Sequence, residues 1–166
     1  IFLFSFYTRG MNFIDIAALK WTDIEENEIH YKRKKTGQLF DIPVNHHTKA
    51  ILDFYKVNNR NCGDYVFPIY NDAIHKTEKQ KYTRKKTAIK KINDRLKVIA
   101  KMIGEEGLKL TTYVSRHSYA TNLKRSGVAT SYISEALGHQ TEEQTQTYLD
   151  EFEKGVISKL ESKIFD

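Results

Sequence analysis

The chain has 166 residues, of which 40% are hydrophobic and 29% charged, and its net charge is +6. This composition is typical of one soluble globular domain and excludes a disordered or low-complexity chain. No apolar run reaches the roughly 18–20 residues that cross a bilayer. The single cysteine, Cys62, excludes an internal disulfide and a zinc site built from cysteine pairs. We therefore expect a cytoplasmic protein that has no membrane partner.

The first seven residues, Ile1 to Tyr7, form an apolar run without an initiator methionine or the charged leader of a signal peptide. Because the chain opens inside an apolar element, we expect a fragment whose N-terminal domain is absent. A turn is expected over residues 7–12. Asn12 is then predicted to cap a short helix through Leu19, with Asp15 three residues after the cap.

The middle of the chain predicts a β-hairpin followed by a helix. Residues 28–35 and 38–44 are rich in strand formers and flank the turn Lys35-Thr36-Gly37-Gln38. Helical periodicity follows over residues 48–58, and residues 62–72 are expected to be irregular.

The last third predicts short helices separated by glycines. Gly127 and Gly138 are expected to end two of them, and Thr141 is expected to cap a third. Residues 153–166 form a tail with a final amphipathic helix. The sequence therefore predicts an α+β fold that is mostly α-helical, has a small antiparallel β-sheet, and forms one domain over residues 1–166.

The positive charge is concentrated between Lys76 and Lys101, where eleven Lys and Arg stand against two acids. From Thr87 onward, apolar residues recur at steps of three and four, which predicts an amphipathic helix. Residues 75–86 are predicted to be a mobile basic loop. A solvated basic face is one interpretation of this charge, and nucleic-acid contact is the other. The DNA-binding candidates are Lys81, Arg84, Lys85, Lys86 and Lys90.

The carboxylates and histidines are not spaced so that two or three of them would lie together as ligands of a metal ion. No P-loop, HExxH, GxGxxG or GxSxG pattern is present. We therefore expect neither a metal nor a cofactor. What remains is a set of cations and a tyrosine. Arg116 lies at the start of a helix, where backbone N–H groups favour anions. His139 follows a helix end, and Tyr148 comes nine residues later.

The run from Thr112 to Leu149 resembles the catalytic core of the tyrosine recombinases, the phage-integrase class of site-specific DNA recombinases. Gly10 to Ile24 resembles the first catalytic box of this family, and Lys35 matches its strand-borne lysine. The motifs that carry the resemblance in the last third are Ser115-Arg116-His117-Ser118-Tyr119-Ala120-Thr121, Leu137-Gly138-His139 and Thr145-Gln146-Thr147-Tyr148.

The resemblance implies that Tyr148 attacks a DNA phosphate and leaves a 3′-phosphotyrosyl bond and a free 5′-hydroxyl. Arg116 would clamp the phosphate oxygens, His139 would donate a hydrogen bond to the phosphate or help manage protons, and Lys35 would protonate the departing 5′-oxygen. A phenol with a pKa of about 10 needs such cations to react near neutral pH. The family also implies a double-stranded DNA partner, a tetramer on paired sites and a nucleoid-associated location. The tail helix would dock on a neighbouring protomer or pack on its own domain.

Two positions depart from the family pattern. Tyr113 stands where the second box has a histidine, so it can donate a hydrogen bond but cannot act as a cation. His117 directly follows Arg116 on the helix and is expected to point elsewhere, so it does not replace that histidine. Asn12 stands at the usual position of the first arginine. Arg9, three residues earlier, could supply the missing guanidinium.

Three other functions remain open from the residues alone. The chain could be a type IB topoisomerase-like enzyme that nicks and reseals one strand, or a non-catalytic DNA-binding protein on the same fold. A helical RNA-binding module would explain the basic segment but not the spacing of Arg116, His139 and Tyr148. Individually, Tyr148 could be a packing residue and Lys35 a solvated hairpin lysine.

Overall fold

The computed structural model describes residues 1–58, 63–105 and 107–150, so the tail helix predicted over 153–166 lies outside the described residues. The chain divides into two compact units, Ile1–Arg116 and the part from His117 onward. In the described ranges, no helix combines the length and the hydropathy that a bilayer crossing requires. The predicted fold class is confirmed, because the elements are mostly helices and the strands form a small antiparallel sheet.

The first unit begins with two short helices, α1 (Phe2–Tyr7) and α2 (Phe13–Ala18). Between them Arg9 and Gly10 both have positive φ angles, 54° and 68°, which end α1 in a tight turn. Asn12 precedes α2 as predicted, but its side chain makes no capping hydrogen bond. Asp15 lies in the first turn of α2, but its carboxylate accepts a backbone N–H from outside this helix, described below.

A three-stranded antiparallel sheet follows, after a 3₁₀ turn over Trp21–Asp23. Its strands are β1 (Ile24–Glu25), β2 (Glu28–Lys32) and β3 (Leu39–Pro43), in that order. The predicted hairpin is confirmed, with Ile29 opposite Ile42 and Tyr31 opposite Phe40. The short strand β1 was not predicted, because two residues carry no periodicity.

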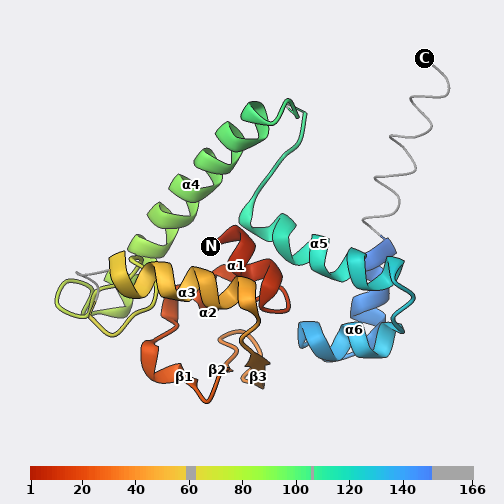
Figure 1. The fold of residues 1–166 in the computed structure, drawn as a ribbon, viewed down its shortest axis with the longest axis horizontal. Coiled ribbons are helices and arrows are strands. Elements are labelled where there is room, and N and C mark those ends of the chain that lie inside the picture. Colours follow the sequence, from red (N-terminus) through yellow and green to blue (C-terminus); the bar gives the residue numbers. More distant parts are fainter. Residues whose placement is uncertain (59–62, 106, 151–166) are drawn as a thin grey trace. The chain divides into compact units, whose positions relative to one another are not determined.

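Two helices complete the first unit before α5: α3 (His46–Asn58) and α4 (Glu78–Met102), the long green helix of Figure 1. The predicted mobile loop over residues 75–86 is wrong from Glu78 onward. Thr77 caps α4 by accepting the N–H of Gln80, whose side chain returns to the Thr77 N–H. This reciprocal cap stabilises a first turn that has few apolar residues, so the helix starts two turns earlier than its hydrophobic pattern indicates.

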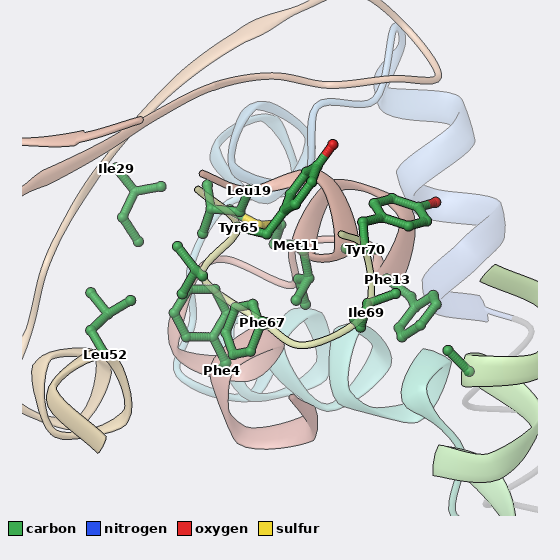
Figure 2. Packing of buried hydrophobic residues seen from close by; sticks show 14 of the residues in the cluster. Phe4, Met11, Phe13, Leu19, Ile29, Leu52, Tyr65, Phe67, Ile69 and Tyr70 are labelled. Atoms are coloured by element: carbon green, nitrogen blue, oxygen red, sulfur yellow. The ribbon is translucent and has the colours of Figure 1, made fainter. Parts of the chain in front are cut away.

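The core of the first unit gathers side chains from α1, α2, α3, the sheet and the segment between α3 and α4 (Figure 2). Phe67, from that irregular segment, packs edge-on against Phe4 of α1 at a centroid distance of 4.8 Å. Leu52 of α3 and Ile29 of β2 are also buried in this cluster. The irregular segment is therefore part of the core, and it places α4 beside α2.

The second unit contains the last part of α5 (Thr112–Arg125) and α6 (Thr130–Leu137), and residues 142–150 are helical. Gly138 ends α6 in the left-handed conformation, at φ 62°, as its position predicted. A small apolar cluster holds these helices together; its buried members are Ala120, Ile133, Leu137 and Leu149.

Candidate active site

Arg116 is buried in the first unit and is tied to the turn after α1. Its side chain is 4% exposed, and its Nη1 donates a hydrogen bond of 2.9 Å to the carbonyl of Gly10. A Cβ atom on Gly10 would lie only 2.8 Å from Cγ of Arg116. The close approach therefore needs a glycine at position 10, and it fixes the guanidinium in one place.

Asp15 lies in the same region, and its carboxylate anchors the hairpin. The Asp15 side chain is buried, and its Oδ1 accepts the backbone N–H of Lys34 at 2.8 Å. Burial raises the pKa of the Asp15 carboxyl, while that hydrogen bond and the charges of Arg33, Lys34 and Arg116 act to lower it. Because Arg33 is only 5% exposed, Asp15 brings a buried carboxylate close to two buried guanidinium groups.

Lys35 lies in the turn that joins β2 to β3, and its side chain is exposed. The turn is closed by the Arg33 N–H, which donates to Gln38, and by the Gly37 N–H, which donates to the Arg33 carbonyl, both at 2.8 Å. The lysine therefore projects from a short turn next to the residue that Asp15 holds. Such a placement suits a group that reaches a ligand without being part of the core.

Tyr31 lies on β2 within electrostatic reach of this group of charges. Burial and the charge of Asp15 raise its pKa to about 12, against the opposing effect of Arg116, Arg33 and Arg9. Tyr31 is therefore a neutral phenol at any pH near neutrality. Because the charges of Arg9 and Arg116 both act on Tyr31, the two guanidinium groups share one electrostatic environment.

The two departures from the family pattern lie at helix starts. Asn12 precedes α2 in an extended conformation, and Tyr113 is the second residue of α5, with 54% of its surface exposed. Arg9 is partly exposed in the turn before α2, in a left-handed conformation that costs a non-glycine residue about 1–2 kcal/mol.

In the second unit His139 and Tyr148 come together. Their ring centroids are 5.6 Å apart, with the planes at 75°, so the two rings meet edge to face. The Nδ1 of His139 lies 2.8 Å from Oγ1 of Thr145, which is fully buried. Thr145 belongs to the same helical segment as Tyr148, so one turn of chain fixes the imidazole beside the phenol.

His117 lies on the face of the Tyr148 ring, which the sequence did not predict. The two rings are stacked, with centroids 4.3 Å apart and planes only 4° from parallel. We had expected His117, as the neighbour of Arg116, to point away from the site, but it contacts the proposed nucleophile. The tyrosine thus contacts two imidazoles, one stacked on its ring and one in an edge-to-face arrangement.

The basic side chains of α4 do not all have the same surroundings. Arg84 donates from Nε to the carbonyl of Ile69 at 2.8 Å and from Nη2 to that of Pro68 at 3.2 Å, so its guanidinium ties α4 to the core segment. Lys85 and Lys86 instead lie over the ring of Tyr82, at 5.1 and 4.6 Å from its centroid. Lys90 and Lys86 are exposed.

A cleft beside α4 links this helix to the hairpin. Lys81 and Lys85 of α4 line it together with Lys34 of the hairpin turn and Lys20. Asp72 offsets part of this charge, because its carboxylate lies 3.5 Å from Nζ of Lys20 and 3.9 Å from Nζ of Lys81. The cleft is therefore a basic surface that begins next to Lys35.

The predicted catalytic residues thus divide between the two units. Arg9, Lys35, Tyr113 and Arg116 belong to the first, and His139 and Tyr148 to the second. Sequence reasoning missed Asp15, Arg33 and His117. For Arg33 a signal exists, because it directly follows the end of β2 and continues the alternating spacing of Ile29 and Tyr31, which face the same side of the sheet. Within the described ranges, no three metal-ligating side chains gather at one point.

Comparison with known proteins is consistent with this arrangement. Residues 2–154 match the family described as the phage integrase family. The chain belongs to the phage integrase family. A prophage integrase of Escherichia coli (strain K12), IntE, is 26% identical over 149 residues, which are 88% of this chain and 39% of that protein.

Solved structures share the fold of this phage integrase family member. The XerA recombinase is 22% identical and has a TM-score of 0.62, over 87% of this chain and 50% of that one. The Tn1549 transposon integrase in complex with transposon right end DNA is 13% identical and has a TM-score of 0.60, over 89% and 52%. The chain therefore spans about half the length of these proteins, or less.

Proposed function

We propose that this chain is the catalytic part of a site-specific DNA recombinase, the integrase of a mobile element. The chain's membership in the phage integrase family supports the reaction class. The observation that carries the proposal is the contact of His139 with Tyr148, in which a hydrogen-bonded imidazole meets a half-buried phenol edge to face.

In the proposed reaction the Tyr148 hydroxyl gives up its proton to His139 or to water, and its oxygen attacks the scissile phosphorus, forms a 3′-phosphotyrosyl bond and releases the 5′-oxygen. Lys35 donates a proton to that oxygen, and the exposed position of the hairpin turn suits such a donor. Arg116 and His139 donate hydrogen bonds to the phosphate oxygens. Because the phosphotyrosyl bond conserves the energy of the broken bond, rejoining needs neither ATP nor a metal.

Arg9 supplies the guanidinium that is missing at Asn12 in this proposal. Its support is the shared electrostatic environment of Arg9 and Arg116 around Tyr31. The variant Arg9→Asn keeps a residue type that tolerates the left-handed backbone. It should slow cleavage strongly, whereas Asn12→Ala should change the rate little.

Double-stranded DNA is the proposed substrate, bound along the basic cleft and the exposed lysines of α4. Lambda integrase, which has the same fold, is known as a dimer bound to a core site. For the whole protein we propose a tetramer on paired sites, with residues 153–166 docking on a neighbouring protomer, and action at the nucleoid. Native mass spectrometry of the whole protein on paired sites would measure this stoichiometry.

Covalent capture tests the proposed chemistry. A pool of nicked duplexes with a randomised centre is incubated with the chain, and covalently attached DNA is recovered after denaturation, amplified and used as a defined substrate. We expect a protein–DNA adduct in the wild type that forms equally in EDTA and is absent in Tyr148→Phe. An adduct that survives in Tyr148→Phe would place the nucleophile elsewhere.

A binding-only protein is the second candidate, favoured by Tyr113 and Asn12 at positions where the family has a histidine and an arginine. It predicts salt-dependent binding to duplex DNA without any covalent product from the pool. Relaxation of nonspecific supercoiled plasmid would instead indicate topoisomerase-like activity.

A further inference from the structure

We propose that His117 is a positioning residue for the nucleophile: its imidazole covers one face of the Tyr148 ring and restricts the directions in which the hydroxyl can point. The inference rests on the proposed function, because it concerns the same tyrosine. The two planes are within 4° of parallel at a centroid distance of 4.3 Å, which is the geometry of a stacked pair.

The Tyr148 ring is enclosed on several sides within the second unit. His117 covers a face, His139 meets the ring at 75°, and the ring packs against the apolar cluster that includes Leu149. Rotation of the side chain about its Cα–Cβ bond, which would carry the hydroxyl oxygen elsewhere, would break the stack with His117 and the contact with His139 together. The two imidazoles therefore favour one rotamer of the Tyr148 side chain.

Both members of the stack are placed by residues of the apolar cluster. His117 and Ala120 are three residues apart on α5, so they lie on the same side of that helix, and Ala120 is fully buried. Tyr148 directly precedes Leu149, which is 2% exposed. Each ring of the stack therefore belongs to a chain segment that is packed into the apolar cluster of the second unit.

Orientation matters because in-line attack on a phosphate needs the oxygen within about 3–3.5 Å of phosphorus along a defined direction. A Tyr148 side chain that changes rotamer freely spends less time with its oxygen in that arrangement, although the protein binds the same DNA. Removing the ring at position 117 should therefore lower the rate of adduct formation and leave the affinity for DNA unchanged.

The test compares His117→Ala with His117→Phe in the 166-residue chain, on the duplex selected by covalent capture. We expect His117→Ala to slow single-turnover cleavage roughly ten- to a hundredfold, with an unchanged Kd for the duplex. His117→Phe, which retains a flat ring, should cleave at nearly the wild-type rate. Tyr132→Ala, which removes a 68%-exposed aromatic ring of the same unit, is the control and should cleave normally.

Wild-type cleavage by His117→Ala would overturn the proposal, and so would a His117→Phe variant as slow as His117→Ala. If His117→Ala does not fold, NMR spectra decide: the ring protons of His117 should be shifted upfield in the wild type and lose that shift in Tyr148→Leu. A missing upfield shift would overturn the stack without reference to cleavage. Failure of the proposed function is distinct, since the wild type itself would then form no adduct.

Discussion

Gly10 and Arg116 lie so close together that a side chain at position 10 would collide with the arginine. An ideal Cβ there meets Cγ of Arg116 at 2.8 Å, and the backbone φ of 68° already disfavours other residues. We expect Gly10→Ala to lower the free energy of unfolding by about 2–4 kcal/mol, combining backbone strain and overpacking. Urea denaturation would measure this loss.

Gly104 provides the matched control for that variant. Its φ is 79° and a Cβ there would have open space around it, so Gly104→Ala adds only the backbone strain, about 1–2 kcal/mol. Equal losses in the two alanine variants would show that the approach of Arg116 is not a tight contact.

The buried carboxylate of Asp15 should make stability depend on pH. Burial raises its pKa, so the folded chain holds this proton more tightly than the unfolded chain does. The free energy of unfolding should therefore fall as the pH rises above the usual aspartate range near 4, as Asp15 ionises in its buried site. In Asp15→Asn this contribution should vanish, and the pH dependence of urea midpoints should flatten.

Asp53→Asn is the comparison for Asp15→Asn. Asp53 is exposed on α3 and pairs with Lys49 at 2.8 Å. Its loss should leave the pH dependence of the wild type in place. A wild-type chain that instead gains stability as Asp15 ionises would mean that the nearby guanidinium groups outweigh the cost of burial.

Single residues show why part of the site could not be predicted from the sequence. Lys35, His139 and Tyr148 carry types and spacings that match a family, so order along the chain was sufficient to propose them. Asp15 acts through the backbone N–H of Lys34, and a main-chain partner nineteen residues away leaves no trace in a motif. His117 was expected to point away from the site because it directly follows Arg116. Its contact with the Tyr148 ring depends on tertiary structure, which the order of residues along the chain does not show.

At the scale of elements, α4 separates two kinds of basic residue that are equivalent in the sequence. Arg84 donates to two carbonyls of the core segment, whereas its neighbour Lys85 lines the basic cleft. We expect Arg84→Ala to lower the free energy of unfolding by about 1–3 kcal/mol, because the part-buried carbonyl of Ile69 and the exposed carbonyl of Pro68 lose a charged donor. Thermal melting would measure it.

Lys85→Ala is the matched variant on the same turn. It should leave the melting temperature almost unchanged and weaken DNA binding uniformly across sequences, with the salt slope reduced by about one. If Lys85→Ala destabilised the chain as much as Arg84→Ala, the distinction between the anchoring arginine and the cleft lysine would be wrong.

The sequence predicted elements well where local chemistry and periodicity agree. The hairpin and the glycine-ended helix α6 have strong local signals, and both are confirmed. The start of α4 was missed because residues 78–86 are too polar to show an apolar face. A capping box at Thr77 and Gln80 was present in the sequence, and it decided the boundary.

At the scale of the whole molecule, the charge of α4 predicts how DNA binding responds to salt. Each lysine that neutralises a phosphate contributes about −0.9 to the slope of log K against log salt concentration. Replacing four lysines of α4 with glutamine should reduce that slope by about three to four, measured by fluorescence anisotropy. These lysines are Lys81, Lys85, Lys86 and Lys90.

A second set of four lysines controls for net charge. Glutamine at these positions changes the total charge equally, and the slope should change much less, because none of the four lines the cleft or belongs to α4. An equal effect would mean that DNA responds to overall charge and not to the surface of α4. The control set is Lys49, Lys56, Lys109 and Lys124.

The hairpin anchor has an evolutionary consequence. Asp15 accepts a hydrogen bond from the backbone N–H of residue 34, so this contact does not depend on the side chain at that position. The Lys34 side chain is itself exposed. Selection can therefore exchange the amino acid beside Lys35 freely, with proline excluded because it has no N–H to donate. The residue beside Lys35 can thus change while Lys35, the proposed general acid, keeps its place in the turn.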